Sequence, residues 1–292
     1  MICSPSHVRS EGLDLVAAFK RLGINTGDTV LIRGALSAIG RVNRDEFLTA
    51  LLDSVGPEGT IVSLAFTDST FLWKAKSLEP FTLKTRSYAG AIPNTMLAHP
   101  DSHRSLHPQC SYVAIGRYAA EIVAGHGPNS PAYEPIRKLI NLNAKMALIG
   151  CVSSSPGFTT VHLAEIDLGH HRRAVFPGLM AASPYIDEDG RVKIFKRKDS
   201  GMCSNSFWKF YGHYVRNGIL RANLIGSAYS ILAPAKACYE LEKEILASNA
   251  RFNICGDPNC VSCNALRWDR IYHVPGLVLS KVWSRVMKRF GS

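Results

Sequence analysis

The chain has 292 residues, of which 46% are apolar, and carries a formal net charge of +11. A chain of this length and composition can bury a sizeable core, so we expect a folded protein rather than a disordered one. No run of about 18 apolar residues is present, which argues against a membrane-spanning helix, and the first residues lack the pattern of a secretory signal. We therefore expect a cytoplasmic protein whose eight cysteines are reduced thiols.

The first part of the chain predicts a strand, a helix and a second strand. Apolar residues recur at helical spacing in 11–22 and end at Gly23, a residue typical of helix C-termini. The apolar run at 28–33 predicts a buried strand, residues 45–55 a helix, and residues 60–65 another strand. Elements in this order form a βαβ unit, in which the two strands are parallel.

The rest of the chain mixes both kinds of element. The pattern predicts helices at 89–97, 119–123, 206–217 and 234–247, a buried strand at 145–149, and one arm of an antiparallel hairpin at 191–196. The predicted fold class is α/β, with a mixed central sheet flanked by helices and a small C-terminal subdomain. We expect a single domain over 1–292, within which 175–292 would be the subdomain.

The segment 158–165 carries the clearest chemical pattern. His162 and Glu165 lie three residues apart, after the apolar run 146–150 and a Ser/Gly-rich loop. In a helix these two positions share a face, so the carboxylate can orient the imidazole. A histidine held by a carboxylate is a common general base near neutral pH. The alternative interpretation is an ordinary solvated pair at the start of a helix.

A cysteine cluster near the C-terminus has the spacing of metal ligands. Cys255, Cys260 and Cys263 lie close in sequence, and either Cys203 or His213 could complete a tetrahedral zinc site. A structural zinc is therefore one interpretation and unligated thiols are the other, so the metal ligands stay unassigned at this point.

The basic charge favours anionic partners. A net charge of +11 attracts phosphates and repels polycations. The Lys and Arg residues are dispersed, and no aromatic-rich recognition motif accompanies them, so we expect no nucleic-acid partner. The segment 274–290 mixes apolar and basic residues. We expect a helix docked on the core with a solvated basic face, and contact with an anionic membrane is the alternative.

Motifs in a fixed order along most of the chain resemble those of the aminoglycoside 3-N-acetyltransferase family. They are Gly-Asp-Thr-Val-Leu-Ile-Arg at 27–33, Leu-Ser-Ala-Ile-Gly at 36–40, Gly-Thr-Ile-Val-Ser at 59–63, Ala-Phe-Thr at 65–67, Arg-Ser-Leu-His-Pro at 104–108 with Ser111 and Gly116, Asn-Ser-Pro at 129–131, Leu-Ile-Gly at 148–150, and Thr-Val-His-Leu-Ala-Glu at 160–165. The resemblance implies an antibiotic N-acetyltransferase-like fold. It also implies a CoA-dependent N-acyltransferase, with acetyl-CoA or another acyl-CoA as co-substrate, that acylates an amino group of an aminosugar by direct transfer.

The resemblance also suggests residue roles. His162 would be the general base, with Glu165 as its orienting carboxylate. Thr67 would donate a hydrogen bond to the oxyanion, and His107 would be a second candidate base at the cleft. Contacts with CoA are implied for the basic loop and for the loop after the first strand: Arg33, Gly34, Ala35, Ser37, Arg104 and Ser105.

The chain departs from the family pattern at one loop of the expected site. Arg33-Gly34-Ala35 stands where members usually carry His-Ser-Ser, and Leu64 stands where Pro is common. Together with the basic charge, this departure favours a nucleotide-linked aminosugar, or one used in surface polysaccharide synthesis, as the acceptor. Two alternatives stay open: an aminoglycoside 3-N-acetyltransferase that confers antibiotic resistance, and a catalytically inactive sugar-binding relative.

Overall fold

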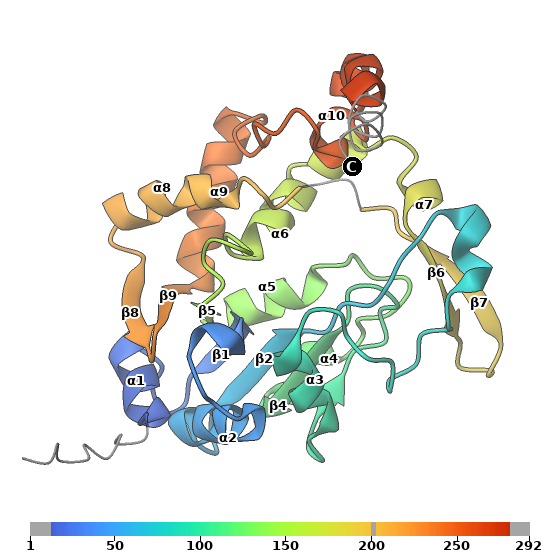
Figure 1. Cartoon of the computed structure of the whole chain (residues 1–292). Helices are drawn as coiled ribbons and strands as arrows, with labels where there is room; N and C mark the ends of the chain where they lie inside the picture. The colour runs from blue at the N-terminus through green and yellow to red at the C-terminus, as the bar shows by residue number, and fades with distance from the viewer. Residues whose placement is uncertain (1–12, 200–202, 281–292) are drawn as a thin grey trace, which may run out of the picture.

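A computed structural model describes residues 13–199 and 203–280 of the chain. Its centre is a seven-stranded mixed sheet with the strand order β3-β4-β2-β1-β5-β9-β8, covered by helices on both faces (Figure 1). The strands are β1 (Thr29–Gly34), β2 (Thr60–Leu64), β3 (His103–Arg104), β4 (Tyr112–Gly116), β5 (Lys145–Ile149), β8 (Arg221–Ile225) and β9 (Ala228–Pro234). The predicted α/β class with a mixed sheet is confirmed.

The middle of the sheet is parallel and its edges are antiparallel. β1 pairs in parallel with both β2 and β5, whereas β4, β9 and β8 join in antiparallel register. The helix α2 (Arg44–Val55) connects β1 to β2, so the predicted βαβ unit is confirmed. Because β1, β2 and β5 run the same way, their carboxyl ends lie along one edge of the sheet, where open α/β sheets bind ligands.

Two apolar cores form on the two faces of the sheet. In β1, Leu31 belongs to one core, and Val30 and Ile32 belong to the other. This alternation follows from the period of two in a strand, and it explains why a buried strand reads as a continuous apolar run. The helices α1 (Leu15–Leu22), α2 and α3 (Ala91–Ala98) cover one face, and α4 (Ala119–Val123), α5 (Glu134–Asn141), α6 (Thr160–Asp167), α8 (Tyr211–Arg216) and α9 (Ala235–Ser248) cover the other.

The helix boundaries follow local capping chemistry. The predicted helix over 11–22 begins at Leu15 because the Asp14 side chain accepts a hydrogen bond from the Ala17 N–H and caps the helix. It ends as predicted at Gly23, whose φ of 112° lies in the left-handed region. The Asn43 side chain caps α2 in the same way, so that helix begins at Arg44.

The remaining elements surround the sheet. β6 (Ala182–Ile186) and β7 (Val192–Lys196) form a separate antiparallel hairpin, as predicted, and it projects to one side of the molecule (Figure 1). The predicted helix over 206–217 is a short 3-10 turn, η4 (Phe207–Phe210), followed by α8. The other short elements are η1 (Leu36–Ala38), η2 (Leu72–Ser77), η3 (His170–Arg173), α7 (Pro177–Met180), α10 (Val261–Asn264) and η5 (Trp268–His273).

The chain beyond residue 175 contributes to the main sheet. β9 pairs with β5 over Lys145 to Ile149, and α9 packs on α6. The subdomain proposed for 175–292 stays a prediction, but its strands β8 and β9 extend the central sheet. Within residues 13–199 and 203–280, no helix is long and apolar enough to cross a membrane. All of the Lys and Arg residues of the predicted tail segment 274–290 lie outside the described residues, which end at 280, so the expected helix with a basic face stays a prediction.

Candidate active site

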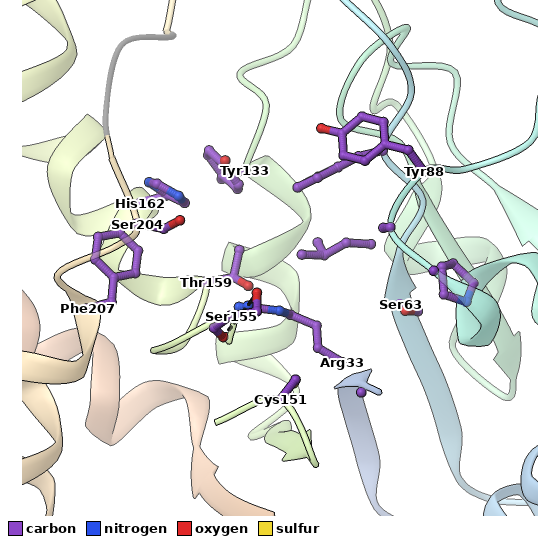
Figure 2. Close-up of a pocket in the computed structure, with 16 residues that line it drawn as sticks. Arg33, Ser63, Tyr88, Tyr133, Cys151, Ser155, Thr159, His162, Ser204 and Phe207 are labelled. Carbon is purple, nitrogen blue, oxygen red and sulfur yellow. Dashed lines mark hydrogen bonds between the residues drawn. The ribbon is translucent and has the colours of Figure 1, made fainter. Parts of the chain in front are cut away.

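A cavity of about 370 Å³ lies at the carboxyl ends of the parallel strands. Gly34 at the end of β1, Leu64 at the end of β2 and Cys151 just after β5 all line it. In Figure 2, His162 and Phe207 stand on one side of the cavity and Tyr88 and Ser63 on the other, with Arg33 between them. The full lining comprises Arg33, Gly34, Ser63, Leu64, Phe66, Tyr88, Ala89, Gly90, Pro93, Tyr133, Cys151, Ser155, Thr159, His162, Ser204 and Phe207.

His162 and Glu165 form the hydrogen-bonded pair that the sequence predicts. Both lie on α6, and Nδ1 of His162 is 2.9 Å from Oε2 of Glu165. The Glu165 side chain is 2% exposed and that of His162 is 14% exposed, so the carboxylate is hidden behind an imidazole that reaches the cavity. With Nδ1 held by the carboxylate, Nε2 is the ring nitrogen left to exchange a proton with a ligand.

Aromatic rings fix the plane of the His162 imidazole. The ring of Tyr133 stacks on the imidazole, with 4.7 Å between the two ring centroids. The ring of Phe207 packs against it in a T-shaped arrangement, with 4.8 Å between centroids. Tyr133 is held in turn by the guanidinium of Arg197, which lies 5.6 Å from the ring centroid and pairs with Asp199 at 2.9 Å. Since the ring is held on two sides, its orientation depends little on a bound substrate.

Arg33 supplies the one guanidinium of the cavity lining in the described residues. It donates to the carbonyls of Gly157 at 3.0 Å and Ser155 at 2.7 Å, so it ties the end of β1 to the loop before α6. Burial lowers the pKa of Arg33 below its usual value, but a guanidinium keeps its charge in a protein. None of the described residues that line the cavity is Asp or Glu.

Of the predicted CoA-contacting residues at the end of β1 and in the loop after it, only some line the cavity. Gly34 lines it, and a Cβ there would lie 2.9 Å from Cδ1 of Ile92 and 3.0 Å from the Ile149 carbonyl. A side chain at position 34 would therefore require Ile92 or the backbone at Ile149 to shift. Ala35 and Ser37 are not among the lining residues, and Ser37 is exposed.

Thr67 does not reach the cavity. Its side chain is buried, and its hydroxyl donates a hydrogen bond to the Pro108 carbonyl. A hydroxyl whose proton is already committed cannot donate to a developing oxyanion, so this geometry does not support the role implied by the resemblance. Thr67 instead joins the end of β2 to the loop before β4.

Arg104 and Ser105 also have structural contacts rather than a place at the cavity. The Arg104 guanidinium donates to the Leu83 carbonyl at 3.0 Å, the Ala65 carbonyl at 3.1 Å and the Thr85 carbonyl. Burial lowers the pKa of Arg104 to about 10. Ser105 is buried and its hydroxyl accepts from the Tyr112 N–H at 2.9 Å. Neither side chain is left free for a phosphate in this arrangement.

His107 is a buried residue outside the cavity lining. Its Nδ1 accepts from the N–H groups of Gln109 at 3.2 Å and Cys110 at 2.9 Å, and its ring stacks on His126 at 4.9 Å. Burial and the neighbouring His126 lower the pKa of His107 to about 3, so the ring is neutral at physiological pH. Between the two candidate bases, only His162 faces the cavity.

Two residues that complete the site are not predicted by the sequence patterns. Asn253 donates its side-chain N–H to Oε1 of Glu165, from a position 88 residues further along the chain. No local sequence pattern predicts a contact between residues so far apart in the chain. Tyr133 lies shortly after the motif at 129–131, and that motif is the signal that could have located it.

Comparison with known proteins gives a consistent result. The model of the aminoglycoside 3-N-acetyltransferase family matches residues 31–247. The chain is 26% identical to aminoglycoside N(3)-acetyltransferase III of a Salmonella species over 226 residues, 70% of this chain and 72% of that protein. It is 27% identical to the Serratia marcescens enzyme of the same name over 248 residues, covering 78% of this chain and 84% of the relative.

Solved structures of similar proteins share the fold. The structure described as AAC-IIIb binary with CoASH has a TM-score of 0.68 and 25% identity, covering 83% of this chain and 97% of that one. AAC(3)-IVa in complex with a gentamicin has a TM-score of 0.71 at 21% identity, covering 87% and 95%, a likeness that shows the fold. The chain therefore belongs to the aminoglycoside 3-N-acetyltransferase family and is an acyl-CoA-dependent acetyltransferase.

Proposed function

We propose that the protein acetylates an amino group of an aminosugar, with His162 as the general base and acetyl-CoA as its co-substrate. The observation that carries this proposal is the 2.9 Å contact between His162 Nδ1 and Glu165 Oε2 beside the cavity. A base must lie within hydrogen-bond reach of the proton that it removes, and His162 is the imidazole of the described cavity lining.

The proposed reaction is a direct transfer between the two substrates. The amine nitrogen forms a bond to the acetyl carbon while the bond from that carbon to the CoA sulfur breaks. The proton lost by the amine passes to Nε2 of His162 and then to the leaving sulfur, so the imidazole is neutral again after each cycle. While the imidazole carries the extra proton, the buried Glu165 carboxylate stabilises its charge.

Aminoglycosides are the acceptor class that the comparisons support. The curated relatives and the family model carry aminoglycoside N-acetyltransferase in their names, and they match most of this chain. The His162–Glu165 pair is also intact, which favours an active enzyme over an inactive sugar-binding relative.

The cavity itself favours a second acceptor class. Its described lining contains the Arg33 guanidinium and no carboxylate, and the chain carries a net charge of +11. A polycationic antibiotic gains most from acidic contacts, whereas a phosphate-bearing acceptor gains from a guanidinium. A nucleotide-linked aminosugar, of the kind used in surface polysaccharide synthesis, is therefore the second candidate.

Thiol release from acetyl-CoA tests both acceptors. The purified protein is assayed against aminoglycosides that include gentamicin and against nucleotide-linked aminosugars, with His162→Ala as the inactive reference. Turnover on aminoglycosides alone would support the first class, and turnover on the nucleotide-linked sugars alone would support the second. Saturable binding of acetyl-CoA with no turnover on either set would contradict the proposal and favour the inactive relative.

A further inference from the structure

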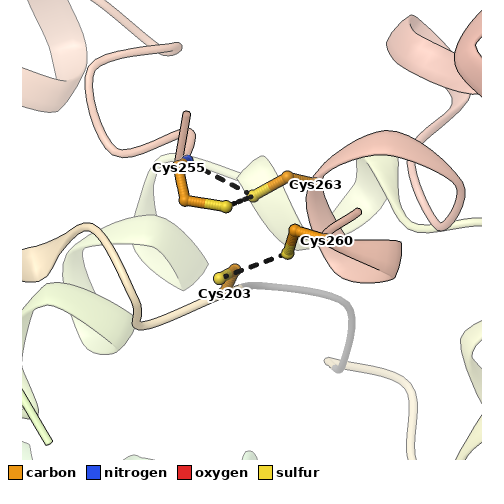
Figure 3. A group of neighbouring side chains, drawn as sticks. All are labelled: Cys203, Cys255, Cys260 and Cys263. Carbon is orange, nitrogen blue, oxygen red and sulfur yellow. Dashed lines mark hydrogen bonds between the residues drawn. The ribbon is translucent and has the colours of Figure 1, made fainter. Parts of the chain in front are cut away.

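Four cysteine thiols lie together at one end of the molecule, outside the cavity lining. Cys203 precedes η4, and Cys255, Cys260 and Cys263 come from the loop after α9 and from α10 (Figure 3). All four Sγ atoms lie within 4.8 Å of one another, although Cys203 is more than fifty positions away in sequence. The acetyl-transfer chemistry of the cavity uses none of them.

The spacing of the sulfurs matches a tetrahedral metal site. Cys255 Sγ is 3.4 Å from Cys263 Sγ, and Cys260 Sγ is 3.6 Å from Cys203 Sγ. Four thiolates at about 2.3 Å from one zinc ion would lie about 3.8 Å apart, close to these values. A disulfide requires about 2.05 Å between its sulfurs, which is much shorter than either distance, and all four cysteines are free thiols.

Backbone N–H groups point at two of the sulfurs. The Cys255 N–H donates to Cys263 Sγ at 3.4 Å, and the Asn205 N–H donates to Cys203 Sγ at 3.4 Å. Such donors stabilise the negative charge of a thiolate and orient it, as the hydrogen-bond partners of metal ligands do. His213, the other sequence candidate for the fourth ligand, instead packs its ring against Phe252 at 5.4 Å and is not part of the group.

We propose that Cys203, Cys255, Cys260 and Cys263 bind one Zn²⁺ as a structural site. Four protein ligands fill a tetrahedral shell and leave no open position for a substrate, so the ion would hold the chain together and take no part in acetyl transfer. Because a tetrahedral set of four sulfurs also suits a single iron ion, the metal must be identified by analysis.

The zinc site connects two segments that form part of the active site. Ser204 and Phe207 closely follow Cys203 and line the cavity, while Asn253 precedes Cys255 by two residues and donates to Glu165. The Ser206 hydroxyl also donates to the Asn253 carbonyl, which joins the two segments next to the metal. This positioning role rests on the proposed function of His162, but the metal site itself does not.

Metal analysis of the full chain, expressed with zinc and purified under reducing conditions, tests the site. We expect one zinc per chain in the parent protein, and its release when a mercurial reagent titrates the thiols. Cys203→Ser and Cys263→Ser should lose the zinc and lower Tm. The matched control is Cys238→Ala, which removes a buried thiol on α9 and should keep the zinc.

The metal content is measured without any assay of turnover, so the zinc proposal can fail or hold independently of the proposed function. Absence of zinc in the folded parent, iron in its place, or disulfides between these cysteines in freshly purified protein would each overturn the proposal. Equal loss of zinc in Cys238→Ala would overturn the ligand assignment. Release of zinc from the parent protein by the mercurial reagent shows that thiols hold the ion, so the test does not depend on the cysteine variants being able to fold. Stoichiometric zinc in a protein with no turnover would support the site and remove only the proposed function.

Discussion

The side chain of Asn253 donates a hydrogen bond to Oε1 of Glu165, and the other oxygen of the same carboxylate faces His162 Nδ1 at 2.9 Å. Each carboxylate oxygen therefore has its own partner, and the buried group cannot rotate without breaking both contacts. A carboxylate accepts hydrogen bonds only, so Nδ1 must carry the proton and Nε2 is left as the basic nitrogen. This chain of contacts gives the proposed base its tautomer.

Replacing Glu165 by Gln should remove activity by reversing that tautomer. The Asn253 N–H would keep the amide oxygen on its own side, so the amide NH₂ would face Nδ1 and donate to it. The imidazole proton would then sit on Nε2, which could no longer accept the amine proton. We expect kcat to fall by about 10²–10⁴ with little change in KM for acetyl-CoA, measured by steady-state thiol release.

The Asn253→Ala variant is the comparison for Glu165→Gln. It keeps the carboxylate and should retain both the metal and most of the activity, because Glu165 loses one partner but still accepts from Nδ1. A smaller fall in kcat than for Glu165→Gln would agree with this account. If Glu165→Gln kept parental kcat, the assignment of Glu165 as the positioning residue would be wrong.

His162→Ala should abolish transfer while leaving acetyl-CoA binding intact. The variant loses the partner of a buried carboxylate oxygen and two ring contacts, so Tm is measured alongside the rates to confirm that the protein is folded. We expect a loss of about 10²–10⁴ in kcat, the usual contribution of a general base. His103→Ala is the control, since His103 is exposed on β3 and outside the cavity lining. Parental rates in His162→Ala would contradict the mechanism.

Arg104→Ala should lower stability rather than weaken CoA binding. The guanidinium satisfies the carbonyls of Ala65, Leu83 and Thr85, which would lose a charged donor. We expect the free energy of unfolding to fall by about 2–3 kcal/mol, measured by urea denaturation. The dissociation constant for CoA, measured on the folded fraction by calorimetry, should be unchanged. A larger dissociation constant for CoA in a variant of parental stability would instead support the CoA-binding role that the family resemblance implies for Arg104.

Glu242 on α9 should make stability depend on pH. It is fully buried and accepts from the Thr160 hydroxyl at 2.9 Å and from the Tyr214 hydroxyl, and burial raises its pKa from 4.5 to about 8. Between these values the folded state binds more protons than the unfolded state, so stability falls as pH rises from 4.5 and levels off above about 8.

Glu242→Gln tests this origin of the pH dependence. The amide keeps an acceptor for the two hydroxyl donors but cannot ionise, so the slope of Tm against pH over that interval should become shallower. Tm measured from about pH 5 to about pH 9 on both proteins gives the comparison. Identical slopes would show that Glu242 is not the titrating group.

The sequence by itself determined the elements whose signals are local. Apolar-rich runs predicted β1, β2 and β5, because a strand buried on both faces takes apolar side chains at most positions. The spacing of His162 and Glu165 placed them on one helix face, because a helix has about 3.6 residues per turn wherever it lies in the fold. The first helix begins later than its apolar pattern predicts because the Asp14 side chain caps it at Leu15, whereas α3 begins two residues late at Ala91 with no side-chain cap.

Tertiary structure decided which side chains meet. Arg104, His107 and Thr67 match family motifs, yet their hydrogen bonds go to carbonyls and N–H groups of neighbouring loops. Asn253 reaches Glu165, and Cys203 reaches the C-terminal cysteines, only because the chain after α9 folds back beside α6. Contacts between distant segments depend on how whole elements pack, and no local spacing in the sequence encodes that packing.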